Sequence, residues 1–150
     1  MHRSALTGTL VLLCCAAVAS ADRAVVFNFE MTSDTPAWGW LAKGLADRLT
    51  CDLFVGASVE MVDRDRMQQV AKKMGWAPEM AGRREPVRII RQSLRPDYLV
   101  PGVYGAADGR LTITAVVVDV RTRREVLRRT VEGPTDDVLE LIRRLSARLG

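Results

Sequence analysis

The stretch Pro96–Glu132 reads PDYLVPGVYGAADGRLTITAVVVDVRTRREVLRRTVE, and it predicts three consecutive strands joined by two short turns. Asp108-Gly109 lies between the first two strand patterns and is a strong hairpin signal, because glycine adopts positive φ at little cost. Pro101 has no amide hydrogen to donate to a neighbouring strand, so it predicts a bulge or an edge within the first strand, Asp97–Ala106. The stretch therefore predicts a β meander with one irregular strand.

The second and third strands of the meander differ in their side-chain pattern. Between Leu111 and Val118, alternate residues are apolar and the intervening ones begin as threonines, so this strand starts with one polar face and ends buried on both. We expect the second turn at Arg121–Arg124, which lacks a glycine, and the third strand at Glu125–Glu132. Gly133-Pro134 is expected to break that strand.

Upstream of the meander, short apolar runs alternate with helical patterns. Ala24–Phe29 (AVVFNF) and Val59–Val62 predict buried strands. Thr35-Pro36 predicts the start of a helix between them, since proline is favoured early in a helix. The apolar face of this helix recurs every three or four residues and consists of Trp38, Leu41, Leu45, Leu49 and Leu53.

Further helical patterns complete the chain. A second helix is expected after Asp63, whose carboxylate can accept hydrogen bonds from free amide groups, and Gly75 is expected to stop it. Trp76–Pro86 predicts a loop, Val87–Leu94 a third helix, and Thr135–Leu149 a closing helix with an acidic start and a basic end. The order β-α-β-α-α-β-β-β-α predicts a mixed α/β (α+β) domain, with helices packed on a sheet of about five strands.

The first twenty-one residues resemble an export signal. A short basic end, His2-Arg3, precedes the apolar run Leu10–Ala19, and Ala19-Ser20-Ala21 offers the small side chains that a signal peptidase requires. The run is shorter than the ~20 residues of a permanent membrane helix. We therefore expect export to the periplasm, with residues 22–150 forming one domain. The alternative is a lipoprotein whose acyl chains are attached at Cys15.

The predicted mature chain carries few groups for catalysis or metal binding. His2 is the only histidine and lies in the predicted signal, which removes a histidine base and a histidine metal ligand. Cys51 is the one cysteine after residue 21, too few for a zinc site or an internal disulfide, and its place in a helical pattern predicts a core position. Asp63 and Asp65 fit helix capping better than a catalytic pair, and no glycine-rich phosphate loop follows a strand. We expect no enzyme, no metal and no cofactor.

The charge of the chain is mildly basic, with 22 Lys and Arg, 18 Asp and Glu, and a formal net charge of +4. This small excess and the export signal argue against a nucleic-acid partner. Arginines gather near the second turn of the meander: Arg121, Arg123, Arg124, Arg128 and Arg129. We expect them to form a solvated basic rim, with Arg128 and Arg129 on opposite faces. Contact with acidic lipid headgroups or glycan phosphates is the alternative.

The order and the residues resemble the TolB amino-terminal-like and CsgG/FlgO-like envelope domain family. AVVFNF with WLAKGLADRLTCDL resembles the family's opening strand and helix, and VEMVDRDRMQQV resembles its second pair. In the meander, Asp97, Gly102 and Asp119 match the family pattern best. The resemblance implies a periplasmic or envelope α/β module that serves in assembly or binding. The loops are too short for the membrane hairpins of CsgG-type channels, so we expect no channel.

Two functional hypotheses follow. The preferred one is a non-catalytic module that binds envelope proteins in assembly or transport, through an exposed patch near Trp38, Trp40 or Trp76. Self-association and membrane contact, through a lipid anchor or the basic rim, are further partner hypotheses. The alternative function is a small-ligand or anion-binding domain with a pocket around Asn28 and Arg64. A structural hydrogen bond for Asn28 and an ion pair for Arg64 are the competing interpretations of those two residues.

Overall fold

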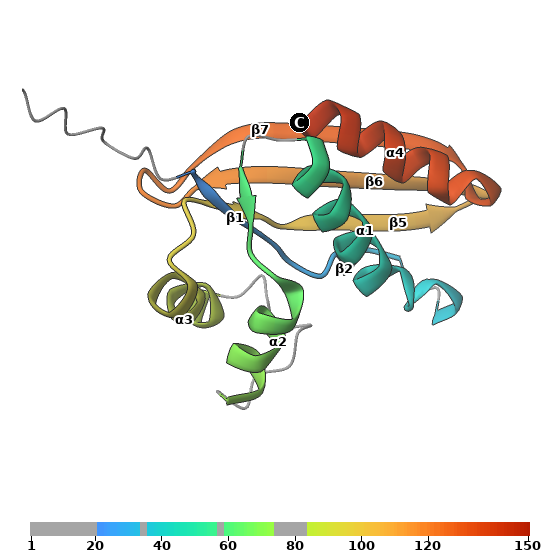
Figure 1. The fold of residues 1–150 in the computed structure, drawn as a ribbon. Helices are drawn as coiled ribbons and strands as arrows, with labels where there is room; N and C mark the ends of the chain where they lie inside the picture. The colour runs from blue at the N-terminus through green and yellow to red at the C-terminus, as the bar shows by residue number, and fades with distance from the viewer. Residues whose placement is uncertain (1–20, 34–35, 57–58, 74–83) are drawn as a thin grey trace, which may run out of the picture.

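The computed structural model describes residues 21–33, 36–56, 59–73 and 84–150. Helices pack on one mixed sheet (Figure 1), which confirms the predicted α/β class. The predicted signal, Thr35, the Gly75 stop and Trp76 lie outside the described residues. Within the described ranges, no helix combines the length and the apolar character that crossing a bilayer requires.

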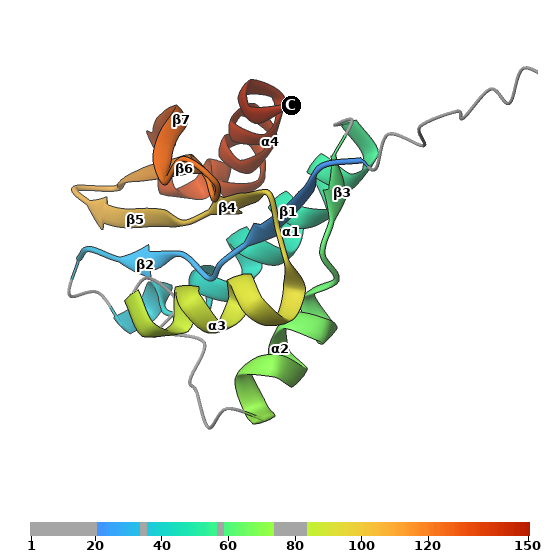
Figure 2. The same cartoon turned by 90° about the vertical axis from the view of Figure 1, so that its left-hand side faces the viewer.

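The sheet is built around two bent strands that run side by side. β1 pairs parallel with β3 and β4, and β2 pairs parallel with β5, so the chain β1–β2 follows the chain β4–β5 (Figure 2). β6 pairs antiparallel with β4, β5 and β7. The strands are β1 (Arg23–Val26), β2 (Glu30–Met31), β3 (Glu60–Met61), β4 (Tyr98–Val100), β5 (Gly102–Ala107), β6 (Arg110–Asp119) and β7 (Arg124–Pro134).

The bends lie at Pro101 and at Phe27–Phe29. Pro101 divides the predicted strand Asp97–Ala106 into β4 and β5, as its missing amide hydrogen predicts, while its carbonyl accepts a hydrogen bond from the Val116 amide at 3.0 Å. The predicted strand Ala24–Phe29 ends early, at Val26. Gly102 allows the aromatic ring of Phe29 to lie against β5, because a Cβ at Gly102 would lie 2.1 Å from Cε1 of Phe29.

Both turns of the meander contain left-handed residues. Asp108 (φ 50°) and Gly109 (φ 71°) form the predicted two-residue hairpin turn between β5 and β6. In the second turn, Arg123 (φ 59°) adopts the conformation that glycine usually supplies. The Thr122 amide donates to Oδ1 of Asp119 at 2.8 Å, so a side chain of β6 stabilises this turn.

The third strand of the meander is longer than expected, and the prediction that Gly133-Pro134 breaks it is wrong. Gly133 pairs with Leu111 and Pro134 with Arg110, so β7 continues to the end of β6. Proline is tolerated there because, among the described strands, β7 pairs with β6 alone, and because the residue lies at the strand end. Gly133 makes room for the closing helix, since a Cβ would lie 2.9 Å from Cδ2 of Leu141.

The helices are α1 (Leu41–Gly56), α2 (Arg64–Lys73), α3 (Arg84–Leu94) and α4 (Val138–Leu149), with 3₁₀ turns at Pro36–Trp38 and Thr135–Asp137. Asp63 caps α2 as predicted, and its Oδ1 accepts from the Asp65 amide at 2.8 Å. α3 begins at Arg84, three residues before the predicted Val87, and a proline in the sequence does not prevent this because proline is tolerated in the first turn of a helix.

Two apolar clusters fill the two sides of the sheet. The face that we call inner packs against α1 and α4 through residues such as Leu45, Ile113 and Leu145. The opposite, outer face packs against α2 and α3, but only over β1, β4 and the end of β6, through Phe27, Ile90 and their neighbours. Because α2 and α3 cover only part of the outer face, the rest of that face remains open to solvent.

The predicted core position of Cys51 is wrong, because its thiol side chain is exposed. The buried face of α1 consists of Leu41, Leu45, Ala46, Leu49 and Leu53. At 100° per residue, Cys51 lies far from the direction of Leu49 and Leu53. The presence of Cys51 in an amphipathic helix was therefore not enough to place its side chain on the buried face.

Candidate functional site

An open groove of about 980 Å³ lies on the outer face, where β5 and β6 are not covered by α2 and α3. Val103 and Thr114, which are paired across β5 and β6, point to this side and line the groove together with Val116. Arg128 of β7 borders the groove beside Val116. We call this surface the outer groove. Its floor is an apolar strip of sheet with β-branched side chains.

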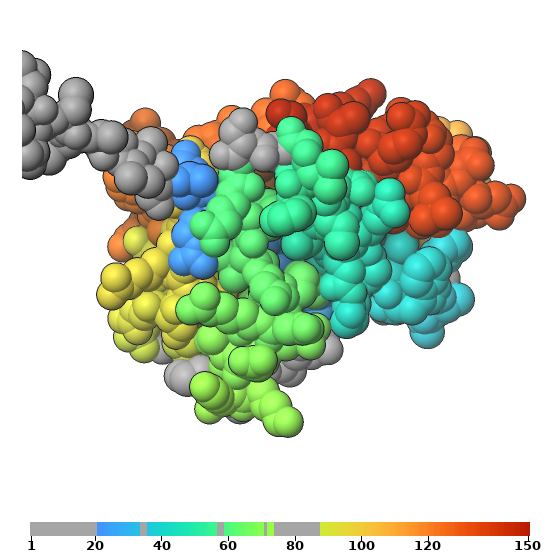
Figure 3. Space-filling view, in the orientation of Figure 1, coloured from blue at the N-terminus to red at the C-terminus, as the bar shows by residue number. Residues whose placement is uncertain are grey.

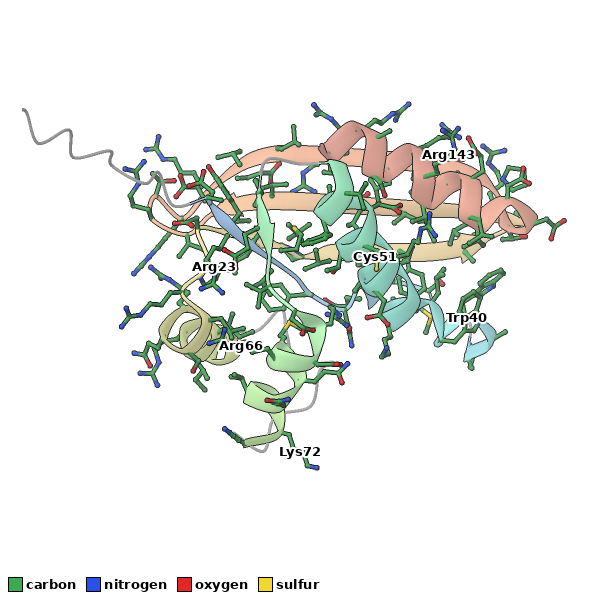
Figure 4. All side chains as sticks on the ribbon, in the orientation of Figure 1. Arg23, Trp40, Cys51, Arg66, Lys72 and Arg143 are labelled. Carbon is green, nitrogen blue, oxygen red and sulfur yellow. The ribbon has the colours of Figure 1, made fainter. Side chains whose placement is uncertain are left out.

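The start of α1 forms one wall of the outer groove. Gly39, Trp40 and Lys43 line it, and the side chain of Trp40 is 63% exposed. Figure 4 shows Trp40 projecting from the chain just before α1. The centroids of the Trp38 and Trp40 rings lie 6.3 Å apart. The backbone carbonyl of Trp38 accepts a hydrogen bond from Oη of Tyr104 at 2.9 Å. The 3₁₀ turn is thereby tied to the sheet, and Trp40 is held at the border of the groove.

The other wall carries a polar network centred on Arg64. Its Nε donates to Oδ1 of Asp47 at 2.9 Å and its Nη1 donates to the carbonyl of Val26 at 2.9 Å. Its Nη2 donates to Oδ1 of Asn28. The guanidinium group therefore joins the end of β1, the middle of α1 and the start of α2.

The charge of Asp47 completes this network. Partial burial raises the pKa of Asp47, but hydrogen bonds from Lys43 and Arg64, with the positive charges of both groups, outweigh that effect and hold the pKa below its usual 3.8. The Arg64 side chain is only 11% exposed. Three of the five N–H groups of Arg64 donate to protein oxygens, so an anion would compete with Asn28, Val26 and Asp47 for this guanidinium group.

A second, smaller groove of about 430 Å³ lies between α1 and α2. Cys51 and Phe54 line it from α1, and Arg64 and Gln68 line it from α2. Gln68 also lines the outer groove, so the Arg64 network separates two open surfaces. In the described ranges of the chain, no group of three His, Cys, Asp or Glu side chains has a geometry that could hold a metal ion.

The structure brings together some of the residues that the sequence singled out. Asn28 and Arg64 contact each other, and Asn28 and Trp40 line the outer groove. Trp38 is half-buried under the wall, and Trp76 lies outside the described residues. Asp47 and Val103 were not predicted. Two features of the sequence could have pointed to Val103: the alternating pattern of β6, and the lack of a helical pattern that could cover β5. No feature of the sequence pointed to Asp47.

Comparisons with known proteins find fold relatives only in solved structures. No protein-family model and no curated protein matches the sequence. The LpoB C-terminal domain from Salmonella enterica has a TM-score of 0.60 at 12% identity, over 80% of this chain and 87% of that chain. Lipoprotein GNA1162 from Neisseria meningitidis has a TM-score of 0.56 at 14% identity, over 85% of this chain and 95% of that chain.

TolB from Acinetobacter baumannii is also similar, with a TM-score of 0.55 at 13% identity, over 87% of this chain and 27% of that chain. This likeness agrees with the TolB part of the predicted resemblance, while its CsgG/FlgO part stays a prediction. At these identities the likeness shows the fold alone: the chain has an α/β fold similar to those of the LpoB C-terminal domain, lipoprotein GNA1162 and TolB.

Proposed function

We propose that this chain is a non-catalytic module of the bacterial envelope that binds a partner protein through the outer groove. The fold likeness to the LpoB C-terminal domain and to lipoprotein GNA1162 supports an envelope role. The sequence supports export, with residues 1–21 as the signal and residues 22–150 as one periplasmic domain. Lipid attachment at Cys15 is the alternative that would anchor the same domain to a membrane.

The observation that carries the proposal is the open, apolar outer groove with an exposed tryptophan at its border. Small-molecule sites enclose most of the ligand surface and present several convergent polar groups. Here the floor is exposed sheet, and the guanidinium group that borders it, Arg128, donates to the carboxylate of Glu125. The guanidinium group of Arg64, beside Asn28, already donates to protein oxygens. An extended segment of a protein with apolar side chains therefore fits this surface better than a metabolite, and Trp40 supplies the kind of aromatic contact that dominates binding energies.

The test is binding by variants that alter the groove without altering the core. Val103 is 38% exposed, and Val103→Asp places a charge on the groove floor. Trp40→Ala removes the aromatic border. The bait is the purified domain, used to capture partners from envelope extract, and each captured protein is then purified and its Kd measured. We expect both variants to weaken binding at least tenfold, because a central aromatic contact contributes about 2 kcal/mol or more.

Leu139→Asp is the matched control, since Leu139 is an exposed apolar residue of α4 on the other side of the sheet. Equal loss of binding in Val103→Asp and Leu139→Asp would refute the groove as the binding surface. Thermal shifts with a panel of metabolites test the alternative function. A shift that Asn28→Ala or Arg64→Met abolishes, with Kd for every captured protein unchanged by Trp40→Ala, would favour the ligand-binding hypothesis.

A further inference from the structure

One end of the molecule gathers arginines from two segments that are distant in sequence. α3 contributes Arg88 and Arg91, and Arg95 directly follows its last residue; the β6–β7 turn contributes Arg121 and Arg123, and β7 begins with Arg124. The Val120 amide donates to the carbonyl of Asp97 at 2.9 Å, which holds the turn against the chain that follows α3. We call these six arginines the basic end.

The basic end does not consist of the same arginines as the predicted rim. Arg128 of the rim pairs with Glu125 on the outer face, and Arg129 turns to the opposite side, where its Nε donates to the carbonyl of Arg148 at 3.1 Å. The prediction that these two diverge is confirmed, and neither joins the turn. By contrast, Arg91, Arg95, Arg121, Arg123 and Arg124 form no ion pair with the described residues.

The arginines of the basic end outnumber the acidic residues among them. Three aspartates lie there: Asp22, Asp97 and Asp119. Asp97 accepts from the Arg23 amide, and Asp119 accepts from the Thr122 amide. The five arginines that form no ion pair with the described residues therefore exceed the three aspartates, which gives this end a positive local charge.

The shape of this end favours a flat anionic partner. Figure 3 shows α3, the start of β1 and the β6–β7 turn meeting at one end of the molecule. Arg88, Arg91 and Arg95 line an open hollow of about 510 Å³ together with Asp97, and Arg121 lines a separate hollow that holds three aspartates. The six arginines therefore do not converge on one pocket, as the donors of a specific anion site do. A spread of arginines on a projecting end can contact many headgroups of a bilayer at once.

The place where the chain enters the fold also supports a membrane as the partner. β1 begins at this end, where Nη1 of Arg23 donates to the carbonyl of Leu94 at the end of α3 (2.8 Å), and Figure 4 shows Arg23 there. Asp22 lies seven positions after Cys15, the position of the alternative lipid anchor. Extended chain of that length spans at most about 25 Å, so an anchor would hold the basic end close to the bilayer.

We propose that the basic end is a membrane-contact surface that binds anionic lipid headgroups. The contact is electrostatic, it orients the domain with the β5–β6 hairpin away from the bilayer, and it leaves the outer groove free for a protein. It does not depend on the outer groove being a binding site.

The experiment is co-sedimentation with lipid vesicles, using residues 22–150. Both core clusters consist of residues from Ala24 onward, and the apolar run Leu10–Ala19 would itself partition into lipid. Vesicles of phosphatidylglycerol and phosphatidylcholine in equal parts are compared with pure phosphatidylcholine, at 20 mM and 500 mM salt. We expect binding to the anionic vesicles alone, lost at high salt because the interaction is screened.

Two independent double variants locate the contact: Arg91→Gln with Arg95→Gln at the end of α3 and just after it, and Arg121→Gln with Arg123→Gln on the turn. Each pair is expected to lower the partition coefficient roughly 25-fold at low salt, at about fivefold per arginine. The matched control is Arg110→Gln with Arg143→Gln, which removes the same charge. Arg110 lies at the far end of β6, roughly 30 Å away, and Arg143 lies on α4. The control is expected to bind within threefold of the unchanged chain.

Several outcomes would overturn the proposal. They are no binding to anionic vesicles at 20 mM salt, equal binding to neutral vesicles, or equal losses in the control and in the two test pairs. Tighter salt-sensitive binding to a polyanionic glycan or to DNA than to the vesicles would assign the arginines to a different partner. Circular dichroism and melting temperature verify that each variant is folded, and having two separate pairs keeps the test decisive if one of them unfolds.

Discussion

Gly102→Ala should destabilise this domain by much more than an ordinary glycine substitution in a strand. The added Cβ would lie 2.1, 2.4 and 2.5 Å from three ring atoms of Phe29, whereas carbon atoms in contact are about 3.5–4.0 Å apart. The ring must therefore move by roughly 1.5 Å. It has little freedom to do so, because Phe29 is buried and its amide donates to the carbonyl of Ala42 at 3.1 Å, which fixes its backbone to α1.

The expected cost follows from overpacking. Forcing extra atoms into a packed core costs about 1–3 kcal/mol, and the fixed backbone of Phe29 places Gly102→Ala toward the upper end, at about 2–3 kcal/mol. For a domain of this size, that corresponds to a fall in Tm of about 8–12 °C. Urea unfolding followed by circular dichroism measures the free-energy change directly.

A double-mutant cycle with Phe29→Ala tests the reasoning itself. With the ring removed, Gly102→Ala should cost less than about 0.5 kcal/mol, because nothing remains for the Cβ to meet. Gly105→Ala in the same strand is the control, since its Cβ would clash with Oγ1 of Thr32 alone, at 2.5 Å. The exposed Thr32 side chain can rotate away at the cost of its hydrogen bond to the Tyr104 carbonyl, so we expect a smaller loss of about 1 kcal/mol. An unchanged Tm for Gly102→Ala, or the same cost with and without the Phe29 ring, would refute the proposed contact.

Three further predictions concern the turn, the polar network and the cysteine. Gly109→Val should lower the free energy of unfolding by about 1 kcal/mol or more, because the φ of 71° strains a β-branched residue; an unchanged Tm in a thermal melt would contradict it. Asp47→Asn should cost about 1 kcal/mol at pH 7. The pKa of Asp47 in the folded protein lies below 3.8, so its carboxylate contributes fully to stability above that pH and loses this contribution as the pH falls through the folded pKa. The stability difference between Asp47→Asn and the unchanged chain, measured by urea unfolding, should therefore shrink below about pH 4. Cys51→Ser in residues 22–150 should change stability by less than about 0.5 kcal/mol, and Cys51 should react with a maleimide in the folded protein; protection from the reagent until unfolding would restore the core assignment.

The meander was predictable because its signals are local. Asp108-Gly109 determines the hairpin through two backbone angles, and Pro101 interrupts a strand through its own missing donor. The continuation of β7 through Gly133 and Pro134 was not predictable in the same way. It depends on Leu141, which lies in a different element and occupies the space left by the absent Cβ.

In the candidate site, too, some residues were predictable from the sequence and others were not. Trp40 and Asn28 drew attention as an aromatic and a polar residue in unusual places, and both line the outer groove. Asp47 gave no signal, because a carboxylate on a helix surface is ordinary until Arg64 is placed beside it. The position of Cys51 was misjudged because residue type was given more weight than its angular distance from the buried leucines of α1.

The pairing of β1 has a consequence for the order in which this domain folds. β1 lies between β3 and β4, and its contacts with β4 join residues 74 positions apart, such as Ala24 and Tyr98. Contacts between distant residues form slowly, whereas β5, β6, β7 and α4 are consecutive and adjacent. The amino-terminal half therefore cannot complete its sheet until Tyr98–Val100 has been synthesised. The predicted export signal would benefit from this order, because β1 has β3 but not β4 beside it until residue 98 has been synthesised, which delays completion of the sheet.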